Sequence, residues 1–257
     1  MKRVLVTGAN GQLGLALEGA LKVSNLDLVF MDKIALDITN AEAIKEVYTK
    51  QSFDVCINAA AYTDVDGAET NKELAYEINA IAVESLAKVC KKHRCWLIHI
   101  STDYVFDGTL DKPYNPEDTP NPLNVYGASK LAGEQAIQAV GGTCSIVRTS
   151  WLYSRYGNNF YTKLQAQLDA GKTLRVTADQ KGCPTRAEDL AGHLLTGISK
   201  QQLSKGISHF CGDEIMTWLG LARRLFPNQK VLGWSGENSP TIRPKKVVLK
   251  NNNSSTV

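Results

Sequence analysis

Short apolar runs alternate with amphipathic segments along the first 150 residues. The apolar runs have the length of buried strands; they are residues 3–8, 26–32, 54–61, 95–102 and 144–150. Between them, apolar residues recur every three to four positions, as in helices with one buried face; these segments are 11–23, 40–50, 71–93 and a helix that begins around Tyr126. The alternation predicts an α/β protein whose mostly parallel, doubly wound sheet is covered by helices on both faces.

The alternation becomes less regular after residue 150. Helices are expected at 158–170, 186–198 and 216–226 and a strand at 173–178, separated by loops that contain Gly and Pro. We therefore expect one domain over residues 1–150 and a smaller α/β lobe over 151–249, partly interwoven with the first. Residues 250–257 are polar and low in complexity, a composition typical of a disordered tail.

Composition and charge exclude several classes of function. Hydrophobic residues make up 43% of the chain and charged residues 21%, as in a globular protein with a substantial core. The formal net charge of +3 is too small to indicate a nucleic-acid partner, and the basic clusters at 91–94 and 243–246 indicate a helix end and a solvated loop. No apolar run is long enough for a membrane span and no leader precedes the first strand, so we expect a cytoplasmic protein without a membrane partner.

The cysteines and histidines indicate no metal and no disulfide. The six cysteines form no Cys-x-x-Cys pair and several lie inside apolar runs, which is typical of reduced, buried thiols. The four histidines lack the spacing of metal ligands.

A glycine-rich turn lies between the first predicted strand and the first predicted helix. The sequence TGANGQLG places Gly8, Gly11 and Gly14 in a G-x-x-G-x-x-G spacing. Glycines there let the backbone turn sharply and let a pyrophosphate reach the amides of the helix N-terminus. A tight turn without a ligand is the alternative, but this position favours a Rossmann-like dinucleotide-binding domain over residues 1–150. Cofactor contacts are also expected from Asn10, Gln12 and Leu13.

Acidic residues follow the second predicted strand. Asp32 ends this strand, where a carboxylate can bond the ribose hydroxyls of adenosine. An acid there favours NAD, whereas the neighbouring Lys33 would tolerate a 2′-phosphate, so both NADH and NADPH stay open. Asp37 and Ile38 are candidates to frame the adenine, and a helix N-terminal region is the alternative interpretation of these two residues.

The stretch NVYGASKLAGEQ contains a tyrosine and a lysine on one helix face. Tyr126 precedes Lys130 by four residues, a spacing that also arises by chance on solvated helices. Thr102 ends the fourth predicted strand, and ligands bind at the carboxyl ends of the strands in such sheets. This context favours a catalytic site.

Several motifs, in order along the chain, resemble the extended short-chain dehydrogenase/reductase family. They are the glycine turn, NAAAYTDVDGAE (58–69), STDYVFDG (101–108) and YGASK (126–130). Residues 148–160 and 179–191 are similar to the members of this family that reduce dTDP-linked 4-ketosugars, and the resemblance runs from residue 3 to about residue 249. It implies that NADPH or NADH reduces the C4 ketone of dTDP-4-dehydro-6-deoxy-L-mannose, in nucleotide-sugar synthesis for cell-surface polysaccharide.

The resemblance also implies roles for individual residues. Thr102, Tyr126 and Lys130 match the catalytic trio of the family. Tyr126 would protonate the C4 oxygen, Lys130 would stabilise the phenolate and bond the nicotinamide ribose, and Thr102 would orient the carbonyl. Further cofactor contacts are implied for Ala59, Ala60, Ala61 and Tyr62, and substrate contacts for Val65, Asp103 and Trp151. Core packing is the alternative for the three alanines, Tyr62 and Trp151, and Asn79 is expected to be structural.

Some positions depart from the family pattern. Members that bind magnesium at a dimer interface do so through glutamates; Glu188 matches one of these, but Ala16 stands at another. We therefore expect no magnesium and a monomer or weak homodimer. Tyr104, instead of an acid, follows Asp103, which disfavours a dehydratase. Another nucleotide-sugar 4-ketoreductase and a non-catalytic subunit resembling methionine adenosyltransferase β stay open, although the complete trio argues against the latter.

Overall fold

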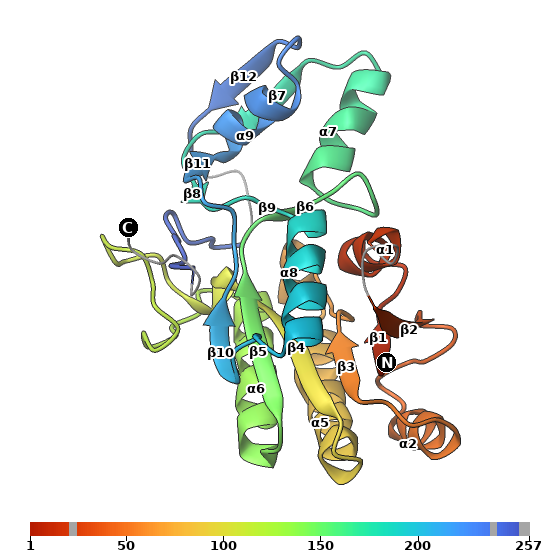
Figure 1. Ribbon diagram of the computed structural model, residues 1–257. Helices are drawn as coiled ribbons and strands as arrows, with labels where there is room; N and C mark the ends of the chain where they lie inside the picture. The colour runs from red at the N-terminus through yellow and green to blue at the C-terminus, as the bar shows by residue number, and fades with distance from the viewer. Residues whose placement is uncertain (21–24, 237–240, 252–257) are drawn as a thin grey trace.

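The computed structural model of the chain describes residues 1–20, 25–236 and 241–251. Within these residues the centre is a six-stranded sheet of order β10-β5-β4-β3-β1-β2 whose neighbouring strands are parallel (Figure 1). The strands are β1 (Lys2–Thr7), β2 (Leu26–Met31), β3 (Val55–Asn58), β4 (Trp96–Thr102), β5 (Cys144–Thr149) and β10 (Gly206–His209). The order reverses between β1 and β3, which confirms the doubly wound sheet expected from the sequence.

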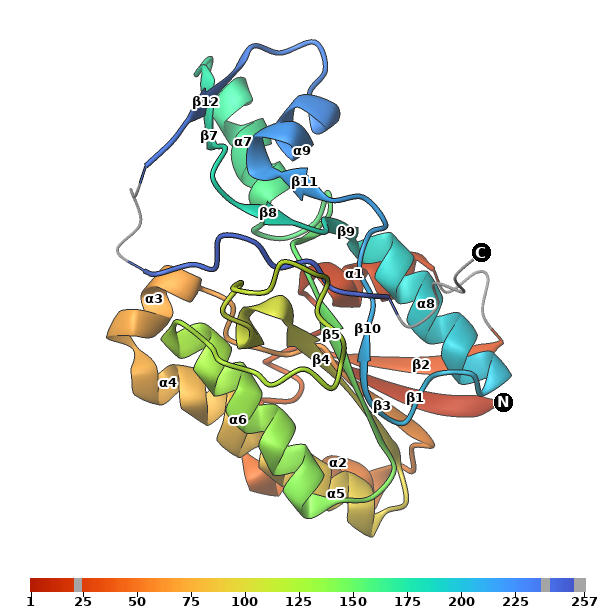
Figure 2. The same cartoon turned by 90° about the vertical axis from the view of Figure 1, so that its left-hand side faces the viewer.

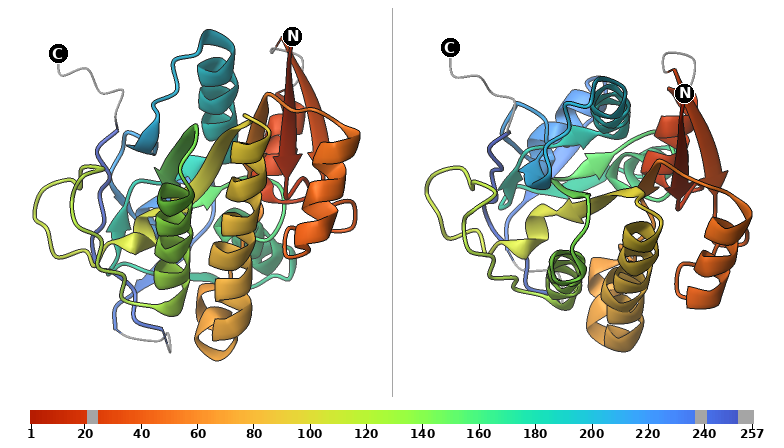
Figure 3. Two further views of the ribbon diagram at one scale, coloured as in Figure 1. Left: turned by 90° about the horizontal axis from the view of Figure 1, so that it is seen from below. Right: turned by 60° about the horizontal axis from the view of Figure 1, so that its bottom comes forward.

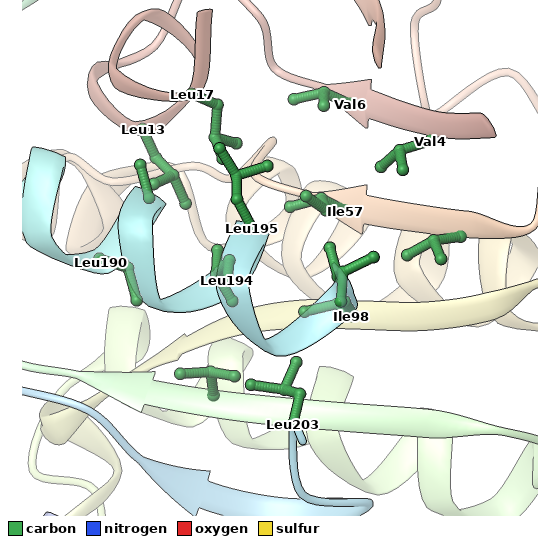
Figure 4. Packing of buried hydrophobic residues seen from close by; sticks show 14 of the residues in the cluster. Val4, Val6, Leu13, Leu17, Ile57, Ile98, Leu190, Leu194, Leu195 and Leu203 are labelled. Carbon is green, nitrogen blue, oxygen red and sulfur yellow. The ribbon is translucent and has the colours of Figure 1, made fainter. Parts of the chain in front are cut away.

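Helices cover both faces of this sheet (Figures 2 and 3). On one face lie α1 (Gln12–Gly19) and α8 (Ala187–Lys200), and on the other α2 (Ala41–Lys50), α5 (Ala82–Lys92) and α6 (Val125–Val140). Within β1, Val4 and Val6 pack toward α1 and α8 while Leu5 packs toward the opposite layer, because successive strand side chains point to opposite faces. Figure 4 shows leucines of α1 and α8 meeting the strand valines and isoleucines in the first of these layers.

The helix expected over residues 71–93 is not one uninterrupted α-helix. The structure has α3 (Val65–Thr70), α4 (Lys72–Tyr76), a π-helical turn η2 (Glu77–Ile81) and then α5. The π turn lies where this segment meets α6 most closely: a Cβ on Gly133 would lie 2.1 Å from the Asn79 carbonyl oxygen. The periodicity of apolar residues contains no sign of this contact with a distant helix, so the prediction of a regular helix is wrong there.

Residues after 150 form a small lobe beyond the carboxyl ends of the sheet strands (Figure 1). Helices α7 (Phe160–Asp169) and α9 (Trp218–Leu225) pack on the parallel pair β7 (Leu174–Thr177) and β12 (Val231–Trp234). Two more pairs connect the lobe to the sheet: β6 (Leu152–Tyr153) with β9 (Thr185–Arg186), and β8 (Lys181–Gly182) with β11 (Met216–Thr217).

Two elements from this part of the chain return to the main sheet. Strand β10 pairs with β5 at the sheet edge, and α8 packs against α1. Strand β7 confirms the strand expected at 173–178. Strands β10 and β12 and the two-residue strands of the lobe were not predicted, because such short runs carry too little periodicity. The division of the chain into a domain of residues 1–150 and a partly interwoven lobe of residues 151–249 stays a prediction.

The segment 241–251 runs back toward the site, and the prediction of a solvated loop at 243–246 is wrong for part of it. Isolated bridges join Lys246 to Lys181 and Leu249 to Tyr114. Val247, Val248 and Leu249 are buried, and Asn251 exchanges hydrogen bonds with the main chain of Cys211. Most of the expected disordered tail, residues 252–257, and residues 21–23 of the first expected helix lie outside the described residues.

The structure bears on three remaining expectations. Each of the six cysteines is a free thiol, and all but Cys144 are buried, which confirms the prediction. In the described ranges, no helix is both long and apolar enough to cross a bilayer. Likewise, these ranges contain no group of three or more His, Cys, Asp or Glu side chains arranged to hold a metal ion.

Gly14 tests the close approach of α1 to the end of β1. A Cβ on Gly14 would lie 2.2 Å from the Ala9 carbonyl oxygen, so Gly14→Ala should lower the free energy of unfolding by about 1–3 kcal/mol through overpacking. Gly19 ends the same helix, and a Cβ there would meet nothing within 4 Å. Gly19→Ala should therefore be neutral or stabilising by up to about 1 kcal/mol. Urea unfolding monitored by circular dichroism compares them, and equal effects would contradict the close approach.

Candidate active site

The glycine turn forms a cradle at the carboxyl edge of the sheet. Gly8 has a φ of +67°, and a Cβ on it would lie 2.7 Å from the main-chain nitrogen of Ala60. Gly11 is the N-cap of α1 and donates its N–H to the Gly8 carbonyl oxygen at 2.9 Å. Glycines at these two positions leave the main chain at the start of α1 without a Cβ, which is the arrangement expected of a pyrophosphate site at a helix N-terminus. Leu13 is 4% exposed and packs in the core, so its part in this cradle is limited to its main chain.

Asp32 lies beside the cradle, in the turn after β2. Its Oδ2 accepts a hydrogen bond from Asn10 Nδ2 at 2.7 Å, and its Oδ1 accepts from the main-chain nitrogens of Ile34 and Ala35 at 3.0 and 2.9 Å. The structure thus brings together Asn10 and Asp32, two of the predicted cofactor contacts. Lys33 is exposed next to them.

Asp37 and Ile38 belong to the turn that leads into α2. Asp37 accepts hydrogen bonds from the main-chain nitrogen and the hydroxyl of Thr39, and these bonds lower the pKa of Asp37 below its ordinary value. Ile38 is 4% exposed and packs in the core. This geometry agrees with the alternative interpretation, a helix entry, and the adenine contact stays a prediction.

The loop that follows β3 lies half-buried next to the cradle. Residues 59–62 make up this loop, and the buried Asn79 fixes its last residue from both sides. Asn79 Oδ1 accepts from the Tyr62 nitrogen at 2.9 Å, while its Nδ2 donates to the Tyr62 carbonyl oxygen and to Ser129 Oγ, both at 3.0 Å. Asn79 therefore has the structural role expected, and it ties the predicted cofactor loop to α6.

The first turn of α6 brings Tyr126 to the end of β4. Asn124 caps this helix by accepting a hydrogen bond from the Gly127 nitrogen at 2.8 Å. A Cβ on Gly127 would lie 2.2 Å from the Tyr104 carbonyl oxygen, so the glycine allows the two segments to touch. The Tyr126 ring lies edge-on to Tyr104 with centroids 5.6 Å apart, and the Thr102 side chain is near enough to the Tyr126 hydroxyl to lower its pKa.

Burial shifts the pKa of both helix residues of the predicted trio. Burial raises the pKa of Tyr126 well above 10, against the effect of the Thr102 side chain. Lys130 is 2% exposed; burial lowers its pKa to about 8, and the charge of Glu134 acts in the opposite direction. At neutral pH Tyr126 therefore keeps its proton and most Lys130 side chains are cationic.

Asp103 follows Thr102 in the short 3₁₀ helix η3 (Asp103–Val105) and is 2% exposed. Its Oδ2 accepts from Ser150 Oγ at 2.7 Å and its Oδ1 from Thr102 Oγ1 at 3.2 Å. Burial raises the pKa of Asp103 to about 6 although both hydrogen bonds lower it. The structure thus places this predicted substrate contact against Thr102, the threonine of the predicted trio.

Trp151 lies at the entrance to the lobe and is half-buried rather than part of the core. It has a φ of +47°, which is uncommon for a residue with a side chain. Its indole stacks on Trp218 with ring centroids 3.6 Å apart and an interplanar angle of 3°. A Cβ on Gly182 would lie 2.6 Å from this indole, so the glycine makes room for the stack. Val65, the other predicted substrate contact outside the trio, begins α3 and is half-buried.

Four residues near the site were not identified from the sequence. Arg243 donates to the Tyr104 hydroxyl at 3.0 Å and to Asp66 Oδ1 at 2.8 Å, although it belongs to the cluster expected in solvent. Trp218 supports Trp151, and His99 and Asn58 are polar groups buried beneath Lys130. The partners of these four residues are distant in sequence. The only sequence feature that pointed to any of them was a histidine, His99, inside the apolar run CWLIHIST.

A buried ion pair fastens α6 to β5 one turn after Lys130. Arg148 donates from Nη2 to Glu134 Oε2 at 2.6 Å and from Nε to Oε1 at 2.9 Å, and both side chains are 1% exposed. Ser101 also donates to Glu134, and Arg148 donates to the Pro116 carbonyl oxygen at 3.2 Å. The pair thereby connects α6, β4, β5 and the loop before α6.

The two positions considered for magnesium, Glu188 and Ala16, lie in different environments. Glu188 is paired with Arg186 at 3.7 Å on the surface, while Ala16 is 3% exposed in the core beneath α8.

A nucleotide cradle that adjoins a tyrosine backed by a buried lysine places the chain among the short-chain dehydrogenases and reductases. The comparison with family models is more specific. The model described as "RmlD substrate binding domain" matches residues 1–256, and the chain belongs to that family.

Relatives and solved structures agree with this family. The chain is 38% identical over 251 residues to the dTDP-4-dehydrorhamnose reductase of Aggregatibacter actinomycetemcomitans, covering 94% of this chain and 84% of that protein. It is 37% identical over 230 residues to that of Sinorhizobium fredii, covering 87% and 77%. A crystal structure of dTDP-4-dehydrorhamnose reductase from Bacillus anthracis in complex with NADP superposes with a TM-score of 0.92 and 38% identity, covering 98% of this chain and 91% of that one.

The pKa of Asp103 predicts a pH dependence of stability. Its pKa rises from an ordinary 3.8 to about 6 in the folded protein, so between these values the folded state holds a proton that the unfolded state has lost. This carboxyl group therefore stabilises the fold below pH 4, and its contribution falls as the pH rises toward 6, by about 3 kcal/mol in total. In Asp103→Asn this contribution is absent. Urea unfolding between pH 4 and 7 should show wild type losing stability relative to the variant; parallel curves would contradict the assignment.

Proposed function

We propose that this chain is an NADPH- or NADH-dependent oxidoreductase of nucleotide-sugar synthesis for cell-surface polysaccharide. It reduces the C4 ketone of dTDP-4-dehydro-6-deoxy-L-mannose (dTDP-4-dehydro-β-L-rhamnose) to dTDP-L-rhamnose. Relatives at 37–38% identity carry the name of this reductase, and the similar Bacillus anthracis structure contains NADP. The observation that carries the proposal is the placement of Tyr126 against η3, directly after Thr102, at the same sheet edge as the glycine turn, whose backbone lies close to the loop after β3.

The cofactor lies along the carboxyl edge in this proposal. Its pyrophosphate rests on the glycine turn, its adenosine extends toward Asp32, Asp37 and Ile38, and its nicotinamide ribose reaches Lys130. When bound, it supplies the hydride that reduces the ketone. Contacts along this path come from Gly8, Asn10, Gly11, Gln12, Leu13, Gly14, Ala59, Ala60, Ala61, Tyr62 and Tyr126.

Three side chains stabilise and neutralise the negative charge that develops on the C4 oxygen. Thr102 orients the carbonyl, and Tyr126 donates its proton to the oxygen; this kind of general acid catalysis contributes roughly 10²–10⁴-fold. The raised pKa of Tyr126 keeps the proton in place until the oxygen becomes basic. The Lys130 ammonium then stabilises the phenolate, because an opposite charge nearby favours the ionised form.

The lobe supplies the substrate contacts. Trp218 holds the half-buried Trp151 in place, and in this proposal the Trp151 indole is the apolar surface against which the methyl-bearing sugar packs. Val65 and Asp103 complete the contacts, from α3 and from the end of β4. In this proposal residues 1–150 form the dinucleotide-binding domain and 151–249 the substrate-binding lobe.

We place this reaction in the cytoplasm. The chain acts as a monomer or weak homodimer without magnesium, and neither nucleic acid nor a membrane is its partner. The small net charge of +3 and the burial of Ala16, where a magnesium ligand would be needed, support this assignment.

Tyr126→Phe tests the proposal against its rivals. Loss of the acid should lower kcat for dTDP-4-dehydro-L-rhamnose by about 10²–10⁴-fold while coenzyme binding survives. NADPH and NADH oxidation measures turnover, and quenching of tryptophan fluorescence measures binding. Tyr76→Phe, at an exposed tyrosine of α4, is the matched control and should turn over normally.

The other outcomes separate the alternatives. Full turnover by Tyr126→Phe would overturn the role of this residue. Turnover by wild type of only a different nucleotide ketosugar would identify another 4-ketoreductase. Coenzyme binding without turnover of any nucleotide ketosugar would favour a regulatory subunit resembling methionine adenosyltransferase β.

A further inference from the structure

A row of buried polar side chains crosses the apolar sheet beneath Lys130. Thr7, Asn58 and His99 are register partners on β1, β3 and β4, and each is 0% exposed. Thr7 Oγ1 lies 2.6 Å from Asn58 Oδ1, and Asn58 Nδ2 lies 3.1 Å from His99 Nδ1. His99 Nε2 lies 3.2 Å from Lys130 Nζ, so the row ends at the predicted catalytic lysine. Polar groups at consecutive register positions of a core sheet cost stability unless they bond one another.

The chemistry of Lys130 decides which way these hydrogen bonds run. An ammonium group has three N–H donors and no acceptor, so His99 Nε2 must offer a lone pair to it. The imidazole is then neutral and carries its proton on Nδ1. In the structure the Asn58 amide accepts from Thr7 through Oδ1 and turns Nδ2 toward His99 Nδ1. This tautomer of His99 therefore requires the amide to be rotated by half a turn, so that Oδ1 accepts from His99 Nδ1 and Nδ2 donates to Thr7. With the amide so rotated, each member of the row donates to the next, from Lys130 to Thr7.

We propose that His99 is a positioning residue for Lys130: its neutral imidazole accepts a hydrogen bond from the lysine ammonium and fixes the position of that charge one turn of α6 after Tyr126. The inference rests on the proposed reductase function. The Ile100 carbonyl oxygen accepts a second hydrogen bond from Nζ at 2.8 Å. Two of the three donors are thereby fixed, which leaves one donor for a ligand.

The surroundings of His99 keep it neutral. Burial lowers the pKa of His99 well below 6.5, and the charge of Lys130 lowers it further. A protonated imidazole would have no lone pair for the ammonium and would repel it. The Lys130 ammonium is therefore bonded to an acceptor, His99, that does not titrate near neutral pH.

The other charged groups around Lys130 change little between pH 7 and 9. Glu134 follows it by one turn of α6 and is paired with Arg148 of β5. Asp103, at the end of β4, has a pKa of about 6, and the pKa of Tyr126 lies well above 10. The pKa of Lys130, about 8, is therefore the one expected to govern the basic limb of the pH profile.

Replacing His99 separates acceptor chemistry from packing. His99→Met keeps much of the volume but removes the acceptor, so a buried ammonium loses a stabilising bond and the pKa of Lys130 falls by about one unit, a tenfold change in proton affinity. His99→Gln retains an oxygen that can take the position of Nε2 and should restore the pKa to near its original value. His93→Met, at an exposed histidine after α5, is the control.

Two measurements test this inference. NMR of protein labelled with ε-¹³C lysine gives the pKa of Lys130 without coenzyme, with Lys130→Met identifying the signal. The basic limb of kcat against pH should move to lower pH by the same amount in His99→Met, return in His99→Gln and stay unchanged in His93→Met. Thermal unfolding and coenzyme binding confirm that each variant is folded.

The outcomes distinguish the two proposals. An unchanged pKa of Lys130 in His99→Met overturns the positioning role, whatever happens to turnover. A shifted pKa that glutamine does not restore also overturns it, because packing would then be the cause. A shifted and restored pKa in a protein that reduces no nucleotide ketosugar leaves the role of His99 supported and overturns the proposed reaction.

Discussion

The buried ion pair between Glu134 and Arg148 is the interaction on which the geometry of the site depends. It joins α6 to β5 one turn beyond Lys130, with both side chains 1% exposed. Removing one partner of such a pair typically costs about 3–5 kcal/mol, because the remaining charge is left uncompensated. The pair therefore fixes the height and rotation of α6 against the sheet. The position of Tyr126 near Thr102 and the contact of Lys130 with His99 both follow from that placement.

The site joins groups whose pKa values burial moves in opposite directions. Burial raises the pKa of Tyr126 and Asp103 and lowers that of Lys130, so each neutral form is favoured. The lysine stays mostly cationic at neutral pH because acceptors surround it, among them the Ile100 carbonyl oxygen. A protonated phenol next to a cation is the arrangement that transfer of a proton to a new alkoxide requires. Polar groups in the middle of a sheet are thus tolerated where they serve a site.

The local pattern of apolar and glycine residues predicted most strands of the main sheet and the location of the site. The features that it missed depend on contacts between residues distant in sequence. Apolar runs predicted the strands from β1 to β5, and the Gly8–Gly14 turn and the Tyr126–Lys130 spacing led to the site. Strand β10, four residues long, was missed because its partner β5 lies some sixty residues earlier. The π turn at η2 contacts a glycine of α6, and Arg243 is half-buried where it bonds Tyr104 and Asp66. None of these contacts leaves a periodic trace in the sequence.

A crystal structure with NADP and dTDP-L-rhamnose would test the account most directly. The account predicts the sugar C4 hydroxyl within about 2.6–3.2 Å of both the Tyr126 hydroxyl and Thr102 Oγ1. The cofactor pyrophosphate should lie on the glycine turn, and the sugar ring should contact the indole of Trp151. A sugar whose C4 lies away from Tyr126, or a cofactor bound outside the glycine turn, would contradict it.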